Sequence, residues 1–241
     1  QEQERQKQEE EERDRENKRR EKEAARDERL HQQRLRGTRL TYLLPESWHD
    51  HADQSFCAET VSIALGEDCI FMLHGGNSCS YWGDVPIGLE NKLKGRQSHL
   101  PGATYASIGS FDRYYIQFAD ARSQWVGPDD LTTELQGASR DVRSVAFGSD
   151  YDTWFVVYAD GYWMWNGDIP AGLAQVLDAD KNSNLRQVSL GPSGEYYIAK
   201  ANGRAWWGGL SDDAFGAIRP YTSRLTFMDF GGDGNLVVRY E

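Results

Sequence analysis

The chain has 241 residues and a formal net charge of −11, with 27 Lys and Arg against 38 Asp and Glu. This balance excludes the clustered positive charge with which proteins bind nucleic-acid phosphates or anionic membranes. No apolar run approaches the roughly 18 residues of a membrane span, and the sequence shows no signal peptide.

Residues 1–36 differ in composition from the rest. They hold 12 basic and 12 acidic residues, and opposite charges recur four residues apart, as in Glu9–Arg13 and Asp14–Lys18. Each such pair contributes about 0.2–0.5 kcal/mol on a helix. No apolar seam supports a coiled coil. We expect a solvated single α-helix, with partial disorder as the alternative, that continues upstream because the chain begins at Gln1.

Residues 37–241 carry the whole net charge, with 15 basic and 26 acidic residues, and are numerous enough for one core. Residues 38–43 read as a strand, and a helix opens near residues 45–48. This helix contains the densest group of potential metal ligands, namely His49, Asp50, His51 and Asp53. Positions 49 and 53 share a helix face but 51 does not, so we expect a solvated polar helix start and no metal site.

A glycine and a tryptophan then recur with a period of about 41 residues. The steps between tryptophans are 43, 40 and 42 residues, and each tryptophan follows its glycine by 16 residues, or 17 in the third copy. The glycines are Gly66, Gly109, Gly148 and Gly191, and the tryptophans are Trp82, Trp125, Trp165 and Trp207. The period is typical of propeller blades.

Each repeat begins with three short antiparallel strands. In the fourth copy these are residues 186–190, 195–200 and 204–207, rich in aromatic and branched residues. Asn202-Gly203 between the last two predicts a type I′ hairpin turn. After the tryptophan comes a short helix that packs an apolar pair on the edge of a blade. The pairs are Leu89 and Leu93, Leu131 and Leu135, Leu173 and Leu177, and Phe215 and Ile218.

The size of the side chains also alternates in the first strand of each repeat. The residue directly before each glycine is bulky, and the residue two positions before the glycine is short. The bulky residues are Leu65, Ile108, Phe147, Leu190 and Phe230, and the short ones are Ala64, Ser107, Ala146, Ser189 and Asp229. This alternation is expected when one face packs between blades and the other meets a crowded axis.

A fifth copy, with Gly231 as its glycine, stops at Glu241 after two strands. Residues 38–58 would supply its missing strand and helix and leave no open sheet edge. We therefore predict a five-bladed, mainly β ring closed by both termini, with a four-bladed ring as the alternative. The repeats are 59–103, 104–142, 143–185 and 186–223, with a shared blade from 224–241 and 38–58. Residues 38–241 resemble β-propeller repeat proteins in general, which implies an architecture and no activity.

The three cysteines, Cys57, Cys69 and Cys79, are an odd set without metal-ligand spacing. Together with the absence of a glycosylation sequon, they favour a reducing, cytoplasmic location. A bridge between Cys69 and Cys79 on adjacent strands is geometrically feasible, but we expect buried free thiols.

Signals for chemistry are weak elsewhere. Asp178, Asp180, Asn182 and Asn184 imitate a calcium loop, but Ser183 and Ser189 replace its essential Gly and Glu, so we expect a polar loop. No nucleophile–base motif or phosphate loop occurs. We expect no metal, no cofactor and no catalytic residues.

The repeated tryptophans are expected to be packing anchors, whereas a ring of sugar-stacking sites is the functional alternative. The neighbouring aromatic residues Tyr81, Trp163 and Trp206 are the better candidates for exposed contacts with a partner. We predict a non-catalytic scaffold for protein–protein interaction in an intracellular assembly, with a basic partner surface. A carbohydrate-binding propeller is the alternative, and a loop-based enzyme is more distant.

Overall fold

The computed structural model describes residues 38–57, 59–75, 78–94, 96, 99–179 and 184–241. The chain divides into two compact units, residues 1–37 and residues 38–241, and the described residues all belong to the second unit. The predicted charged helix of residues 1–36 and most of the imitation calcium loop therefore lie outside the described residues.

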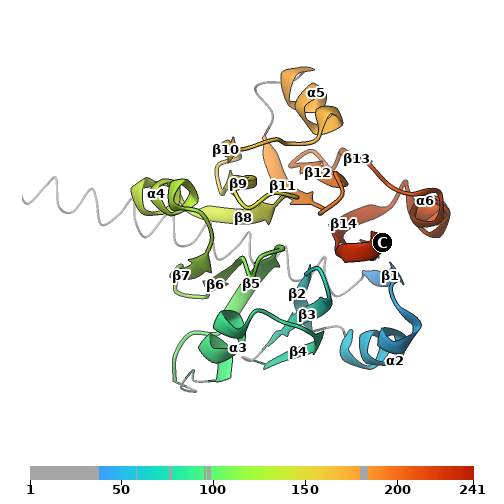
Figure 1. Ribbon diagram of the computed structural model, residues 1–241, viewed down its shortest axis with the longest axis horizontal. Helices are drawn as coiled ribbons and strands as arrows, with labels where there is room; N and C mark the ends of the chain where they lie inside the picture. Colours follow the sequence, from blue (N-terminus) through green and yellow to red (C-terminus); the bar gives the residue numbers. More distant parts are fainter. Residues whose placement is uncertain (1–37, 58, 76–77, 95, 97–98, 180–183) are drawn as a thin grey trace, which may run out of the picture. The chain divides into compact units, whose positions relative to one another are not determined.

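The described residues are mainly β and form five three-stranded antiparallel sheets (Figure 1). The first contains β2 (Thr60–Leu65), β3 (Cys69–His74) and β4 (Ser78–Gly83), and the second β5 (Ala103–Ile108), β6 (Tyr114–Phe118) and β7 (Ser123–Val126). The third contains β8 (Val142–Phe147), β9 (Trp154–Tyr158) and β10 (Trp163–Asn166), and the fourth β11 (Leu185–Leu190), β12 (Tyr196–Lys200) and β13 (Ala205–Gly208). The prediction of three strands in each repeat is confirmed.

The fifth sheet combines the two ends of this domain. It contains β1 (Arg39–Leu43), β15 (Leu236–Tyr240) and β14 (Leu225–Phe230), with β15 in the middle. β1 pairs with β15 from Arg39 opposite Tyr240 to Leu43 opposite Leu236. The predicted sharing of a sheet by residues 38–58 and 224–241 is thus present in the strand pairing.

A helix follows the outermost strand of each sheet, on the outside in Figure 1. The helices are α2 (Glu46–Ser55), α3 (Ile87–Lys94), α4 (Asp129–Gly137), α5 (Ala171–Ala179) and α6 (Asp212–Ile218), with short 3-10 turns at Arg219–Tyr221 and Gly232–Gly234. α2 contacts β4, α5 contacts β12 and β13, and α6 contacts β1, so each of these helices packs on the next sheet. Among the described residues, no helix combines the length and apolarity needed to cross a membrane.

The first apolar residue of three predicted pairs, Leu89, Leu131 and Leu173, is fully buried. The pair proposed for α6 is wrong in one member, because Phe215 is 46% exposed. Ala214 and Ile218 are buried in its place. The helix begins at Asp212 after Ser211, whose Oγ accepts the Ala214 N–H at 3.2 Å, and this start turns positions 214 and 218 inward.

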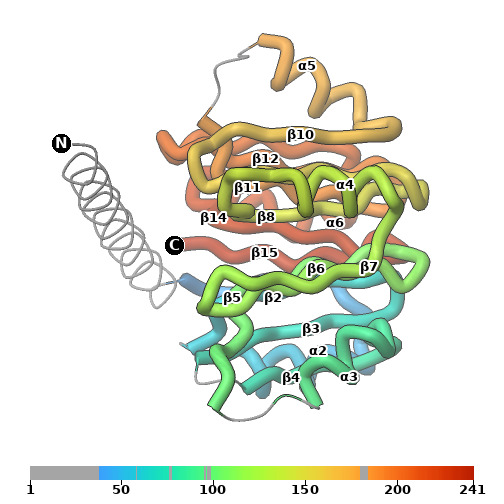
Figure 2. The backbone as a smooth tube through the Cα atoms, turned by 90° about the vertical axis from the view of Figure 1, so that its left-hand side faces the viewer, coloured from blue at the N-terminus to red at the C-terminus, as the bar shows by residue number. Residues whose placement is uncertain are grey.

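The innermost strands β2, β5, β8, β11 and β14 converge in the middle of the described domain (Figure 1), and Figure 2 shows the same strands from the side. Each contacts the next, and β14 contacts β2. The glycine that ends each of these strands faces the bulky residue of the following sheet. A Cβ added to Gly66 would lie 2.8 Å from Ile108, and one added to Gly191 would lie 2.9 Å from Phe230. Glycine is therefore required by close approach between sheets.

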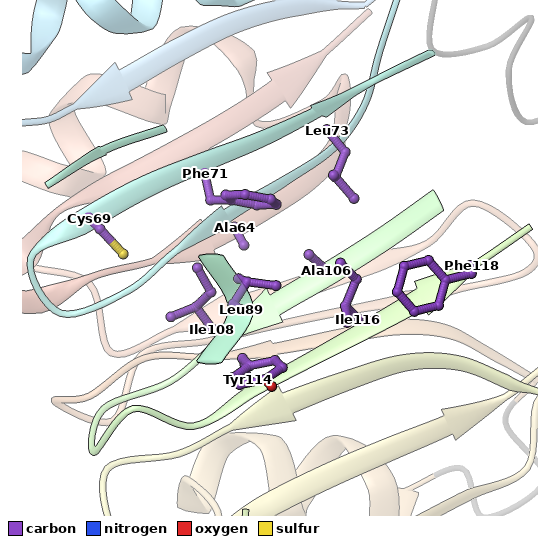
Figure 3. Close-up of a cluster of buried hydrophobic side chains, with 10 residues drawn as sticks. All are labelled: Ala64, Cys69, Phe71, Leu73, Leu89, Ala106, Ile108, Tyr114, Ile116 and Phe118. Carbon is purple, nitrogen blue, oxygen red and sulfur yellow. The ribbon is translucent and has the colours of Figure 1, made fainter. Parts of the chain in front are cut away.

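The same contact joins the last sheet to the first, since a Cβ on Gly231 would lie 3.5 Å from Leu65. The five bulky residues predicted to pack between sheets, Leu65, Ile108, Phe147, Leu190 and Phe230, are all buried. Figure 3 shows one such cluster, in which Leu89 of α3 and Ile108 of the second sheet lie against Ala64 and Phe71 of the first. The core is thus divided into layers between neighbouring sheets.

The four tryptophans were predicted to hold equivalent positions, but the strand register shows that Trp82 does not share the position of the other three. Trp125, Trp165 and Trp207 lie opposite Tyr115, Phe155 and Tyr197 of their middle strands. In the first sheet the matching position is Tyr81, opposite Phe71, and Trp82 lies opposite Ile70 on the other face.

Turn length is the physical reason for this shift. The turn closed by the Gly66 N–H ends at Cys69, one residue sooner than the turn from Gly109 to Arg113. An unchanged spacing of 16 residues therefore places Trp82 one residue too far along its strand. The expectation of buried anchors also fails for Trp82 and Trp165, which are 41% and 40% exposed.

The predicted type I′ turn at Asn202-Gly203 is also wrong. Gly203 has a positive φ of 84°, but Asn202 does not have a positive φ. The Gly203 N–H bonds the Lys200 carbonyl at 3.0 Å, and the Lys200 N–H bonds the Arg204 carbonyl at 2.8 Å. This pattern is a three-residue loop, in which an ordinary turn is followed by one left-handed glycine.

Candidate functional site

A groove lies between α5 and the middle and outer strands, β12 and β13, of the fourth sheet. Its volume is about 410 Å³, within the size range of ligand pockets. It is lined by Gly172, Gln175, Val176 and Ala179 from α5, and by Tyr196, Lys200, Asn202, Arg204 and Trp206 from the β12–β13 hairpin. We call this the α5 groove.

The floor of the α5 groove is apolar and aromatic. Trp206 lies opposite Ile198, and Tyr196 lies two residues before Ile198 on the same face of β12. α5 turns Leu173 and Leu177 into the core, so Val176 is left at the groove. A Cβ on Gly172 would lie 2.5 Å from the Tyr196 hydroxyl oxygen, so this glycine lets the helix approach the ring.

Cationic and amide side chains complete the lining. Lys200 is only 6% exposed, and its Nζ lies 5.0 Å from the centre of the Trp206 ring, within the range of a cation–π interaction. Arg204, Asn202 and Gln175 are exposed at the rim. Burial raises the pKa of Tyr196, which keeps its hydroxyl protonated and able to donate. None of the lining residues that the structure describes is acidic, although the domain as a whole has an acidic excess.

Lys200 holds a position that recurs in every sheet, as the last residue of the middle strand. The residues at this position are His74, Phe118, Tyr158, Lys200 and Tyr240. In the first sheet, Cys57 from the segment behind α2 covers the position, with its Sγ 3.8 Å from His74 Nδ1. In the second, the Arg96 guanidinium lies 3.6 Å above the Phe118 ring.

The third and fifth sheets are covered in the same manner. The Tyr158 hydroxyl donates to Glu134 of α4. The Tyr221 ring, which follows α6, stacks on Tyr240 with centres 4.0 Å apart. At the fourth sheet, the α5 groove lies at the corresponding place among the described residues.

The three predicted contact residues have different surroundings. Trp206 lines the α5 groove, and Trp163 packs against the same hydrophobic cluster from the third sheet. Tyr81 lies in the first sheet, is 38% exposed and donates its hydroxyl to Glu90 Oε1 at 2.6 Å. The structure therefore brings Trp163 and Trp206 to one cluster and leaves Tyr81 apart.

Sequence reasoning missed Tyr196, Lys200, Arg204 and Gln175 as members of a site. Lys200 is the buried last residue of β12, at a position where the other sheets have histidine or an aromatic residue. An alignment of the repeats by middle strand contains this signal. The groove is formed by α5 together with the β12–β13 hairpin, so the sequence of the strands alone does not reveal it.

A pairing of Cys57 with His74 was also missed. His74 Nδ1 lies 3.1 Å from Thr60 Oγ1, and Nε2 lies 3.0 Å from Ser80 Oγ. Burial lowers the pKa of His74, so its ring is neutral and satisfied by two hydroxyl groups. A lowered pKa makes the His74 ring a weaker base toward the Cys57 thiol. Cys57, Cys69 and Cys79 are all free; of the two thiols expected to be buried, Cys69 is buried and Cys79 is partly buried.

The histidine cluster of α2 is engaged within the protein. His49 Nε2 bonds the Leu44 carbonyl at 3.0 Å, and the His51 ring stacks on Trp82 at 3.7 Å. Asp53 accepts a hydrogen bond from the Tyr42 hydroxyl at 2.7 Å. Within the described part of the chain, no three potential ligands gather as a metal site requires.

No protein-family model and no curated protein sequence matches this chain. Solved structures that are similar include human WBSCR16, which is 14% identical with a TM-score of 0.40 and covers 76% of this chain and 58% of its own. Prp20p from Saccharomyces cerevisiae, studied for its binding to Gsp1p and histones, is 13% identical over 75% of this chain and 56% of its own, with a TM-score of 0.34.

The β-propeller domain of Cps50 (Swd1) from Myceliophteria thermophila is 8% identical, with a TM-score of 0.31, over 58% of this chain and 48% of its own. The chain therefore spans 58% of WBSCR16 and less of the others. In architecture it resembles β-propeller proteins. Likenesses this low carry no argument about activity or partners.

Proposed function

We propose that residues 38–241 form a five-bladed propeller closed by its two ends, and that this ring is a non-catalytic scaffold for protein–protein interaction. Five sheets in the described residues, and the contact of β14 with β2, support the ring. A shared last sheet also fits a closed ring, because pairing of the two termini holds the circle together.

One observation carries the scaffold proposal, namely the α5 groove, which described residues of α5 and of the β12–β13 hairpin line together. An aromatic floor with a polar rim is the composition of binding hot spots.

The partner we propose is a protein within an intracellular assembly. Three free cysteines are in keeping with a reducing compartment. The acidic excess of residues 37–241 favours a basic surface on the partner outside the groove, and association would then weaken as salt rises.

Carbohydrate binding at repeated sites is the alternative function. It requires aromatic faces at equivalent places in several sheets. By strand pairing, aromatic residues do hold one equivalent place in four sheets, namely Tyr81, Trp125, Trp165 and Trp207. The residues that correspond to Trp206 of the α5 groove are Ser80, Gln124, Met164 and Thr41, none of which is aromatic. We therefore propose single-site protein binding at the groove, and carbohydrate binding at the four equivalent aromatic residues stays the alternative.

The test is site-specific crosslinking with a photoreactive amino acid at Ala179, the last residue of α5. The matched control places it at Gly137, the exposed last residue of α4, where an added Cβ has open space. We expect one protein from the source cells to be captured at 179, not at 137, and to be lost with Trp206→Ala. Circular dichroism would verify that this variant folds.

Identical capture at both positions, or capture unchanged by Trp206→Ala, would contradict the proposal. Release of the partner by a simple sugar, with several equivalents of sugar bound per chain, would favour the carbohydrate alternative instead.

A further inference from the structure

We propose that the turn between β5 and β6 and the turn between β8 and β9 together form a docking surface for a positively charged protein segment. Lysine or arginine side chains of this segment would pack on Phe111 and Tyr151. The inference rests on the proposed scaffold function and locates the contact with the partner's basic surface. Its starting point is a pair of exposed aromatic rings that two neighbouring sheets bring together.

The two rings lie side by side at the surface. Phe111 belongs to the turn between β5 and β6 and is 60% exposed, and Tyr151 belongs to the turn between β8 and β9 and is 43% exposed. Their centres are 6.2 Å apart and their planes are inclined by 76°, which is an edge-to-face contact. The second and third sheets therefore share one aromatic surface.

A buried arginine holds the two turns together. The Arg113 guanidinium donates to the Ser110 carbonyl in the first turn at 2.9 Å, and to the Asp150 and Tyr151 carbonyls in the second at 2.7 and 3.0 Å. It also lies 5.6 Å from the centre of the Phe111 ring and 5.9 Å from that of Tyr151. The surface is thus assembled before a partner arrives, which lowers the entropic cost of binding.

The backbone at Phe111 is strained. Phe111 and the following Asp112 have positive φ values of 63° and 56°. The turn between β14 and β15 has the same hydrogen bonds across its ends, and there Asp233 and Gly234 hold the two positions. Aspartate and glycine enter the left-handed region more readily than a bulky aromatic residue does. Phenylalanine here costs stability and exposes an apolar ring, and contact with a partner gives it a function that the turn does not require.

Charge determines which partner segment fits. The five turns between innermost and middle strands lie at one end of the sheets, because their glycines contact equivalent residues of the next sheet. Every residue of these turns is described, and their exposed charged residues are all acidic. These residues are Glu67, Asp68, Asp112, Asp150, Asp152 and Asp233.

Three of these acids adjoin the aromatic pair in sequence. Asp112 follows Phe111, and Asp150 and Asp152 flank Tyr151, so three carboxylates stand against the single guanidinium of Arg113. A lysine or arginine side chain can lie over an aromatic ring and pair with a neighbouring carboxylate. An acidic segment would meet like charge at the same place. Aromatic faces and an acidic border therefore select a basic segment.

The first experiment measures fluorescence anisotropy of short labelled peptides with the full 241-residue chain. In one peptide Arg alternates with Ser, in the second Gln replaces Arg, and in the third Glu replaces Arg. We expect saturable binding of the Arg peptide that weakens as salt rises. The Gln and Glu peptides should bind about tenfold more weakly or worse.

The second experiment removes the rings one at a time. Tyr151→Ser and Phe111→Asn should each weaken the Arg peptide about fivefold. The control is Tyr162→Ser, which removes an exposed tyrosine from the turn at the other end of β9 and should change binding by less than about twofold. Asparagine tolerates the left-handed conformation, so Phe111→Asn should not lower the midpoint of urea unfolding. Weaker binding by this variant is then not a consequence of unfolding.

The third experiment removes equal charge from the two ends of the same strands. The double variant Asp112→Asn, Asp152→Asn acts beside the rings, and the control Asp120→Asn, Asp160→Asn acts in the turns that follow β6 and β9. Each double variant removes two negative charges and keeps the shape of the side chains. We expect the first to weaken the Arg peptide about tenfold and the second by at most about twofold.

Several results would overturn the inference. Equal weakening by the two double variants would mean that the charge of the whole surface attracts the peptide. Binding unchanged by both Tyr151→Ser and Phe111→Asn would place the basic segment elsewhere, and tighter binding of the Glu peptide would exclude a basic one. If the Arg peptide does not bind, the inference fails, whereas crosslinking at position 179 tests the proposed function separately.

Discussion

Three hairpins between middle and outer strands use one residue in the left-handed conformation at the same place. Gly161 and Gly203 have φ values of 84°, and Ala121 has a φ of 64°. Each donates its N–H to the carbonyl three residues earlier. Glycine adopts this conformation without steric cost, whereas alanine does not. The second sheet therefore stores a small strain at Ala121.

Replacing Ala121 with glycine should stabilise the domain by about 0.5–1 kcal/mol, because relief of the strain exceeds the added entropy of the unfolded chain. Gly203→Ala should destabilise it by a similar amount. A Cβ on Gly203 has no atom within 4 Å, so the effect there is one of backbone alone. Urea unfolding of both variants measures the difference, and shifts of the same sign would contradict this explanation.

Arg113 joins two elements that are distant in sequence. It stands before β6, is completely buried, and its guanidinium donates to backbone carbonyls in its own turn and in the turn between β8 and β9. The acceptors are the carbonyls of Ser110, Gly148, Asp150, Tyr151 and Thr153. Burial lowers the pKa of Arg113 to about 10, which leaves it charged at neutral pH.

Removal of this guanidinium by Arg113→Met should destabilise the domain by about 3 kcal/mol or more, because several buried carbonyls lose their donors. Arg122→Ala provides the comparison at an exposed site and should change stability by less than about 0.5 kcal/mol. Chemical unfolding followed by tryptophan fluorescence reports both. A loss below about 1 kcal/mol for Arg113→Met would show that water replaces the guanidinium.

The junction between the last and first sheets is held by two ionisable residues, the partly buried Asp229 and the buried Arg239. Asp229 of β14 accepts the Leu65 N–H of β2 at 2.9 Å. Arg239 of β15 donates from its Nη2 to the Thr60 carbonyl at 3.1 Å and from its Nε to Thr38 Oγ1 at 3.1 Å. Asp229 stands where the other repeats have alanine or serine, and it lines a small central cavity of about 10 Å³.

Asp229 should make stability depend on pH. Burial raises its pKa from 3.8 to about 7, against the lowering effect of the Leu65 and Phe230 N–H groups. A raised pKa means that the folded state binds the proton more tightly. Its favourable contribution is complete below pH 3.8 and is lost as pH rises through about 7. The loss amounts to at most about 1.4 kcal/mol per pH unit in this window.

The measurement compares the wild-type chain with Asp229→Asn by urea unfolding between about pH 5 and about pH 8. The free energy of unfolding of the wild type, minus that of the variant, should fall as pH rises. This difference removes the opposite contribution of His74, whose lowered pKa weakens the fold at acid pH in both proteins. Parallel pH profiles would show that Asp229 keeps an ordinary pKa.

Local pattern in the sequence determined most of the secondary structure and its order. The strands of every repeat, the helices after them and the joining of residues 38–58 to the last sheet all follow from periodicity, turn residues and the missing third strand of the fifth copy. The five bulky residues before the glycines were also assigned correctly to the layers between sheets. These features depend on neighbours along the chain, which the sequence displays directly.

Only the tertiary structure decided which side chains meet. Because one turn is a residue shorter, Tyr81 and not Trp82 holds the position of the repeated tryptophan in the first sheet. Because α6 begins after the cap at Ser211, Ala214 and not Phe215 is buried. The α5 groove is formed where a helix of one repeat, α5, packs against the β12–β13 hairpin of the next repeat. Such contacts join residues far apart in sequence, and their openness is a property of packing that no single repeat contains.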